Sequence, residues 1–426
     1  MNLAARRVFR ALCALAFASF PLAPLAWAED ASSSGSGGFN WTAPIRVAGA
    51  GPAYLNLSLD ALFAVGTSSE ADVTSLELGG HDPSQRGFTV QNVEVVFDGA
   101  VDPYLRGAAN IIFQIDPEGE TVVELEEAYL VTQSLPADLQ VKAGQYLTEL
   151  GRINSRHPHQ WDFVDLPLVN GRLLGGDGLR GPGARLSWLI PLPFYSELIA
   201  GVQNSQGETA ASFRNENEGE PLYGRIPEDR GVNDLGDMLW SGRWASSFDV
   251  TDEQTLVFGF SGVGGPNATG ANTHTQIYGA DLFWKWKSPR AEQGFPFASF
   301  TTEVLYRRYQ AGAFEAEPED PEEPPLVLPH ETLDDWGLYA QASYGFTRGW
   351  VAGLRGDYVD GETGAFDPDP DRSQRVRVSP VLTWYPTEFS KLRLQYNLDR
   401  VEDRAYDHSI WLSAEFLIGS HGAHSF

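Results

Sequence analysis

The side chains that could do chemistry are few, and histidines stand out among them. His157 and His159 lie two residues apart, and His421 and His424 lie close to the end of the chain. Imidazoles bind transition metals when further donors such as carboxylates complete the ligand set. Each pair alone provides too few ligands for a metal ion. The sequence therefore predicts a candidate metal site only if these histidines are brought together with carboxylates.

Two other motifs fail when their context is considered. Residues 176–181 match G-x-G-x-x-G, but no helix is expected after them and no strand-helix-strand unit surrounds them, as nucleotide binding would require. Asp367, Asp369 and Asp371 have the spacing of a calcium loop, yet Arg372 stands where the glycine should be. Neither a nucleotide site nor an EF-hand is expected.

An enzyme is also not expected. His408 and Ser409 are neighbours near the start of an expected strand, so their side chains point to opposite faces and cannot form a simple catalytic pair. The single cysteine, Cys13, lies in the N-terminal leader described below, which excludes disulfides and thiol catalysis from the mature chain. We expect neither a chemical step nor a cofactor.

Composition narrows the class further. Among 426 residues, 57 Asp and Glu outnumber 30 Lys and Arg, and the resulting net charge of -27 argues against a nucleic-acid partner. Residues 1–28 have the basic start, the apolar stretch and the small-residue cleavage site of a signal peptide. No later run of about 20 apolar residues predicts a membrane-spanning helix. Residues 29–52 are expected to be a flexible N-terminal segment, and residues 53–426 a single domain.

The strongest pattern in this domain is an alternation of apolar and polar residues with period two. In one example, Leu392, Leu394, Tyr396 and Leu398 alternate with Arg393, Gln395, Asn397 and Asp399. A strand between lipid and water has this pattern. About 16 such segments of roughly 9 to 14 residues occur, the length needed to cross a membrane as a tilted strand. They lie near 53–65, 88–98, 103–115, 121–133, 138–147, 182–190, 194–204, 237–249, 255–263, 274–287, 297–310, 335–347, 349–360, 373–386, 390–400 and 407–418.

The connections alternate between short turns and long polar loops, as in a bacterial outer-membrane barrel with short periplasmic turns. This predicts an all-β fold, a transmembrane antiparallel β-barrel of about 16 strands in the outer membrane of a Gram-negative bacterium, with both termini periplasmic. The third long connection, residues 148–181, carries apolar residues that would be poorly placed in water. We expect this loop to fold inward and narrow the pore.

Two sets of charged residues follow from this arrangement. Those expected at the pore constriction are Glu149, Arg152, Arg156, Asp162, Asp165, Arg172, Asp177 and Arg180. Those expected on the pore wall are Arg106, Arg243, Arg307, Arg355, Arg375, Arg377, Lys391 and Arg393. Opposed charges across a constriction would create a transverse field that filters ions. In the alternative interpretation, these arginines pair with wall carboxylates such as Asp357 and Asp399 and stiffen the barrel.

A signal peptide, alternating strands and a terminal Phe426 together resemble Gram-negative outer-membrane porins. The residues 126–129 and 144–145 are similar to phosphate-selective porins. Residues 144–146, 151–152 and 157–163, with the histidines at the end, resemble outer-membrane proteins linked by name to zinc regulation. The porin resemblance implies a channel in contact with outer-membrane lipid that passes small hydrophilic solutes or ions by passive diffusion, and it implies a homotrimer. The alternative is a specific channel or receptor for a metal ion or metal complex.

Overall fold

The computed structural model describes residues 45–50, 53–215, 217–316, 325–402 and 404–419. By its contacts the chain divides into two units, Met1–Asn40 and Trp41–Phe426. The first unit, which contains the expected signal peptide, lies outside the described residues, as do His421, His424 and Phe426. Among the described residues, no helix is long and apolar enough to cross a membrane.

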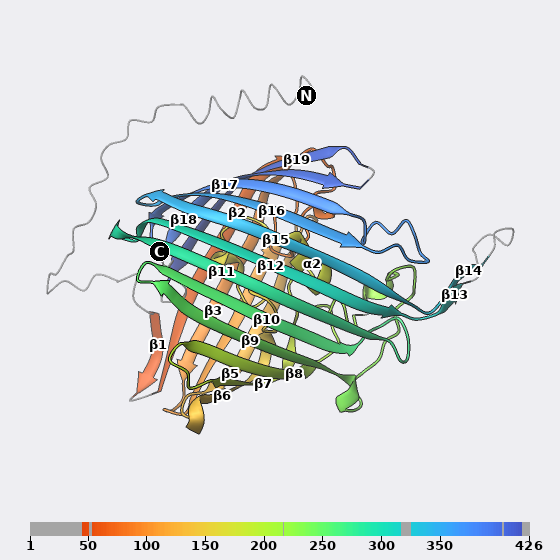
Figure 1. The fold of residues 1–426 in the computed structure, drawn as a ribbon, viewed down its shortest axis with the longest axis horizontal. Helices are drawn as coiled ribbons and strands as arrows, with labels where there is room; N and C mark the ends of the chain where they lie inside the picture. The colour runs from red at the N-terminus through yellow and green to blue at the C-terminus, as the bar shows by residue number, and fades with distance from the viewer. Residues whose placement is uncertain (1–44, 51–52, 216, 317–324, 403, 420–426) are drawn as a thin grey trace, which may run out of the picture. The chain divides into compact units, whose positions relative to one another are not determined.

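Sixteen antiparallel strands form a closed ring, in which each strand pairs with the next one along the chain (Figure 1). The ring closes where β19 pairs with β2, from Ser409 opposite Ser68 to Ile418 opposite Leu59. Its strands are β2 (Ala53–Ser68), β3 (Gly87–Ala100), β4 (Leu105–Ile115), β5 (Thr121–Thr132), β6 (Leu139–Leu147), β7 (Arg180–Leu189), β8 (Tyr195–Asn204), β9 (Met238–Thr251), β10 (Gln254–Pro266), β11 (His274–Glu292), β12 (Phe295–Ala311), β15 (Glu331–Thr347), β16 (Trp350–Gly361), β17 (Arg375–Thr387), β18 (Ser390–Val401) and β19 (Tyr406–Ile418). The all-β barrel of about 16 strands is thus confirmed.

Other elements extend from the ring or connect its strands. The strands β13 (Phe314–Ala316) and β14 (Leu326–Leu328) form a separate hairpin. Within the described ranges the α-helix is α2 (Leu168–Leu174), and the 3-10 turns are η1 (Val73–Ser75), η2 (Pro136–Asp138), η3 (Pro158–Gln160), η4 (Asn217–Gly219) and η5 (Leu235–Asp237). The long connections, at 69–86, 148–179, 205–237 and 312–330, lie at one end of the ring, and every connection at the other end is a short turn.

One segment differs from the sequence prediction. Residues 45–50, expected to belong to a flexible N-terminal segment, form β1 (Ile45–Ala50). This strand pairs with Ala53–Leu57 of β2, the part of β2 that lies beyond its pairing with β19. An unpaired strand edge leaves backbone donors and acceptors unsatisfied, and β1 satisfies them here. The alternation in so short a segment is too weak to predict a strand.

The two faces of the ring are inverted relative to a soluble protein. Along β18 the side chains of Lys391, Arg393 and Gln395 are buried, whereas Leu394 and Tyr396 are 48% and 37% exposed. A soluble protein buries its apolar face, because water excludes it. An exposed apolar face around a closed ring and a buried polar face inside are what a barrel surrounded by lipid requires.

The exposed apolar face predicts how a new charge affects stability. We expect Leu394→Arg, near the middle of β18, to destabilise the barrel by about 2–4 kcal/mol in lipid vesicles, because a cation would be placed in the hydrocarbon. The control Val250→Arg, one residue before the end of β9 and 57% exposed, should cost about 0–1 kcal/mol. Guanidinium unfolding of both variants in phospholipid vesicles measures the difference. Equal small effects would contradict a lipid-facing surface.

Candidate functional site

The loop of residues 148–179 packs against the buried face of the barrel wall. Its helix α2 begins after Pro167 and ends at Gly175, whose φ of 93° favours glycine. This helix contacts β12, β15 and β16. Apolar side chains of the loop form one buried cluster with residues of the wall: Leu150, Ile153, Trp161, Leu166, Leu168, Val169, Leu173, Leu174, Leu305, Tyr339 and Val359. Burial of these apolar side chains stabilises the contact between the loop and the wall through the hydrophobic effect.

Asp165 provides the electrostatic part of this attachment. Its carboxylate lies 2.5 Å from Arg377 Nη1 and 2.9 Å from Arg355 Nη2, and all three side chains are at most 1% exposed. The Gln395 side chain also donates a hydrogen bond to Asp165. Burial alone would raise the pKa of Asp165, but Arg355 and Arg377 outweigh burial and hold the pKa below its ordinary value. The loop thus brings a fixed negative charge to two wall arginines.

The wall cations predicted from the sequence are paired with wall carboxylates. Arg355 bonds to Asp357 at 2.8 Å and Arg377 to Asp399 at 2.8 Å, which are the acids named in the alternative interpretation. The further pairs are Arg243 with Asp281, Arg307 with Asp335, Arg375 with Asp399 at 3.9 Å, and both Lys391 and Arg393 with Glu415. Arg106 is exposed near the short turns. Apart from Arg106, these cations therefore contact their counter-charges directly and do not face them across a gap.

The other residues predicted at the constriction lie in several environments. Glu149 lies 3.4 Å from Arg185 on β7, and Asp162 accepts a hydrogen bond from Gln341. Arg152 lies 4.1 Å from the centre of the Phe283 ring, and Arg156 accepts a bond from Trp161 through its carbonyl. Asp177 lies close to Gly80. Arg180 does not belong to the loop: it is the first residue of β7, where it pairs with Glu124 and Glu126.

A second loop, residues 69–86, also contacts these buried charged groups, although no sequence pattern indicated that it would. Glu77 lies 2.6 Å from Arg377 Nη1 and accepts a hydrogen bond from Trp411. Asp82 accepts a bond from the backbone N–H of Leu166, which joins the two loops. Gly176 approaches this loop so closely that a Cβ there would lie 2.8 Å from Gly80 N. Gly176 therefore serves close packing between the two loops.

A cavity of about 350 Å³ remains between these loops and the wall. Four arginines line it: Arg172, Arg307, Arg375 and Arg404. Arg172 Nη1 and Arg375 Nε are buried and have no hydrogen-bond partner among the described residues. Burial, together with the neighbouring charge of Arg307, lowers the pKa of Arg172 to about 10 despite the opposing effect of Asp335. The cavity therefore has more positive charge than its immediate partners neutralise.

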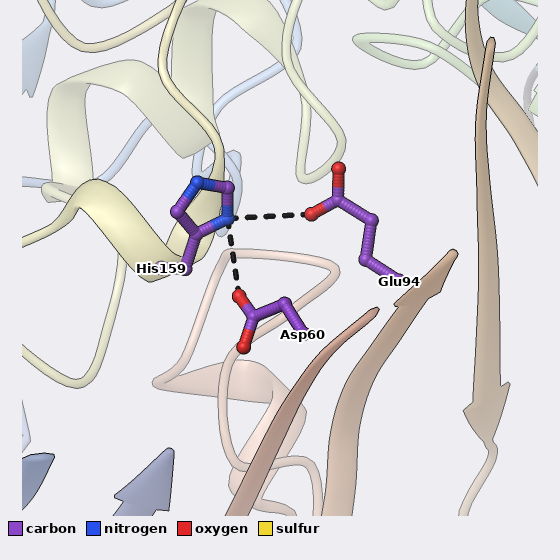
Figure 2. Close-up of side chains that lie close together, drawn as sticks. All are labelled: Asp60, Glu94 and His159. Atoms are coloured by element: carbon purple, nitrogen blue, oxygen red, sulfur yellow. Dashed lines mark ion pairs between the residues drawn. The ribbon is translucent and has the colours of Figure 1, made fainter. Parts of the chain in front are cut away.

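The histidine prediction falls on residues that the structure brings together with carboxylates. His159 Nδ1 lies 3.1 Å from Asp60 and 3.3 Å from Glu94, and His157 Nδ1 lies 2.6 Å from Glu126 (Figure 2 shows the first group). Burial alone would lower the pKa of His159, but Asp60 and Glu94 outweigh burial and raise it to about 9. The three carboxylates are inward-facing strand residues, and their alternation with apolar neighbours could have selected them.

Comparison with known proteins gives one relative in sequence. The chain is 32% identical over 403 residues to a protein of Aquifex aeolicus (strain VF5) described as an uncharacterized protein, and the match covers 87% of this chain and 79% of that one. The chain belongs to the same family as that protein. No protein-family model matches the chain.

Solved structures are similar in fold at low identity. The anion-selective porin from Comamonas acidovorans has a TM-score of 0.53 and 9% identity, over 86% of this chain and 100% of that chain. The outer membrane channel DcaP of Acinetobacter baumannii has a TM-score of 0.51 and 10% identity, over 86% and 97%. These likenesses show that the fold is a porin-like β-barrel.

The contacts of Asp165 predict a large and pH-dependent effect of its removal. Asp165→Asn leaves buried arginines with one counter-charge fewer, so it should lower the free energy of unfolding by about 3–5 kcal/mol near neutral pH. The pKa of Asp165 is lower in the folded protein than in the unfolded chain, so its contribution is fully present above about pH 4. The contribution should be lost as the pH falls through the folded-state pKa. Denaturant unfolding followed by tryptophan fluorescence measures both effects.

The exposed Asp162 provides the matched control. Asp162→Asn should change the free energy of unfolding by no more than about 0.5 kcal/mol, because this side chain is exposed and forms no buried ion pair. A similar effect of both variants would contradict the role of Asp165 in anchoring the loop.

Proposed function

We propose that the chain is a porin-like channel of the outer membrane that passes small hydrophilic solutes or ions by passive diffusion, without a chemical step. The observation that carries this proposal is the closed ring of strands with an exposed apolar face and a charged interior. A ring of this strand number is wide enough to hold a water-filled path. The fold likeness to two channels supports it. Both ends of the barrel domain would lie on the periplasmic side, with the short turns.

The loop 148–179 acts in this proposal as the constriction. Its buried cluster and the contacts of Asp165 fix the loop against β12 and β15–β18. The loop therefore narrows the cross-section of the path through the barrel. The loop 69–86 reinforces it through Asp82. The arginine-lined cavity beside α2 is then the polar space through which a solute passes.

An anionic solute is the class that this cavity favours. Arg172, which is half-buried, forms no ion pair among the described residues, whereas Arg307 and Arg375 share wall carboxylates. Positive charge in a confined, partly dry space raises the local concentration of anions. Asp371 and Arg404 also line the cavity with opposite charges, but both are exposed to water, which screens them.

The metal-specific channel expected as the alternative has weaker support. His159 and its partners Asp60 and Glu94 are at most 1% exposed, so an ion bound there would not lie on an open path. A transported ion must bind weakly enough to leave. The homotrimer implied by the resemblance to porins remains a prediction, which chemical cross-linking in native outer membranes would test.

Planar-bilayer conductance in a salt gradient tests the channel and its preference together. We expect stable conductance steps and a reversal potential that indicates anion preference. Arg172→Ala should reduce the anion-to-cation permeability ratio by about fivefold, the effect of about 1 kcal/mol from one nearby charge in water. The control Arg308→Ala removes the same charge from a side chain that is 52% exposed and should leave the ratio unchanged.

The outcomes separate the two parts of the proposal. A folded barrel without conductance would overturn the channel. Conductance with cation preference, unaffected by Arg172→Ala, would overturn the anion preference and leave the channel in place.

A further inference from the structure

One loop residue meets two strands at a compact group of possible metal ligands. His159 comes from η3 of the loop 148–179, Asp60 from β2 and Glu94 from β3 (Figure 2). One ligand atom from each residue lies within 4.8 Å of the other two. Asp60 and Glu94 face each other directly in the β2–β3 register. The two carboxylates are therefore held by the sheet, and only His159 depends on the loop.

The distances within this group match those between ligands of a single metal ion. His159 Nδ1 lies 3.1 Å from Asp60 Oδ2 and 3.3 Å from Glu94 Oε2. Nitrogen and oxygen ligands at about 2.1 Å from a metal ion lie about 3.0 Å apart at an octahedral angle and about 3.4 Å apart at a tetrahedral one. An ion could therefore bind with little movement of the side chains.

The neighbouring histidine provides an internal comparison. His157 Nδ1 lies 2.6 Å from Glu126 Oε2, which is shorter than the separation of two ligands on one ion. That distance fits a direct ion pair between a protonated imidazole and a carboxylate. Lys142 and Arg180 provide Glu127 and Glu126 with further cationic partners. Among the described residues, the ion-pair partner of Asp60 is His159.

Two buried side chains on β2 and β3, Asp60 and Asn92, have polar atoms without a hydrogen bond of ordinary geometry. Neither oxygen of Asp60 accepts a hydrogen bond that meets the ordinary geometry, and among the described residues its ion-pair partner is His159. Asn92, two residues before Glu94 on β3, is 0% exposed, and both its amide atoms have no hydrogen-bond partner among the described residues. Burying such groups without partners is costly, and coordination of a cation would compensate the carboxylate.

We propose that Asp60, Glu94 and His159 bind one first-row divalent transition-metal ion, which ties the loop 148–179 to β2 and β3. Imidazole together with carboxylates selects this class over Ca²⁺ and Mg²⁺, which prefer oxygen ligands alone. The ion is resident and not transported, because its ligands are buried. This site is independent of the conduction path, since it lies among β2, β3 and η3 and shares no residue with the arginine-lined cavity.

Cobalt binding to the refolded full-length mature chain tests this proposal without any measurement of conductance. Co²⁺ should bind at one equivalent per chain with visible d–d absorption, and Zn²⁺ should displace it. His159→Ala should weaken binding by more than about 100-fold, since loss of a direct ligand exceeds the usual effect of losing a supporting group. Asp60→Asn, which preserves shape, should do the same. Circular dichroism and heat-modifiable migration verify that each variant has folded.

Histidines elsewhere in the chain provide the controls. The double variant His421→Ala with His424→Ala, and the variant His408→Ala, should retain the wild-type affinity, because none of these residues belongs to the proposed site. Zn²⁺ should also raise the midpoint of thermal unfolding of the wild type but not of His159→Ala.

Three results would overturn the proposal. They are no Co²⁺ binding by the folded wild type, equal affinity of His159→Ala and wild type, and loss of binding only in the His421→Ala with His424→Ala variant. Each result would leave the proposed channel unaffected.

Discussion

Compensation of charge in the barrel interior is the constraint on which the rest of the structure depends. Closing sixteen strands with their apolar faces outward places the polar faces inside, and the loops then cover them. Arg355 and Arg377 are at most 1% exposed as a result. A buried charge without a partner is strongly unfavourable, so every covered cation needs a nearby anion. Wall carboxylates supply part of this compensation through Asp357 and Asp399, and the loops supply the remainder.

The same constraint explains why two loops hold one conformation. Arg377 contacts Asp399 on the wall, Glu77 of the loop 69–86 and Asp165 of the loop 148–179, so one guanidinium joins three segments. The planar fork of arginine can donate to several acceptors at once, which a lysine cannot do with the same geometry. The apolar cluster around α2 excludes water from these contacts and strengthens them. Packing and ion pairing therefore support each other at the same place.

Sequence patterns predicted the strands of the barrel wall much better than the arrangement of the loops and charges inside the barrel. Period-two alternation located all sixteen strands of the ring, because each strand must separate lipid from polar groups over its whole length. Many of the apolar residues of 148–179 that led to the expectation of an inward-folding loop are buried in the structure. Alternation contains no information about which loop meets which strand, so the pairing of Asp165 with Arg377 and the role of Glu77 were not predictable. For the carboxylates near His157 and His159, alternation could have shown that they face inward, but not that they meet these histidines.

Pairing of the interior charges also changes how the net charge should be interpreted. The chain has a net charge of -27, which alone would suggest a preference for cations. Charges in direct ion pairs, such as Arg243 with Asp281, produce little field a few ångströms away, and exposed acids are screened within about a Debye length. The field in the cavity is then set mainly by Arg172, which is half-buried and has no ion-pair partner among the described residues. In a barrel of this kind the ion preference follows from local uncompensated charge, and the total charge mainly affects solubility and association.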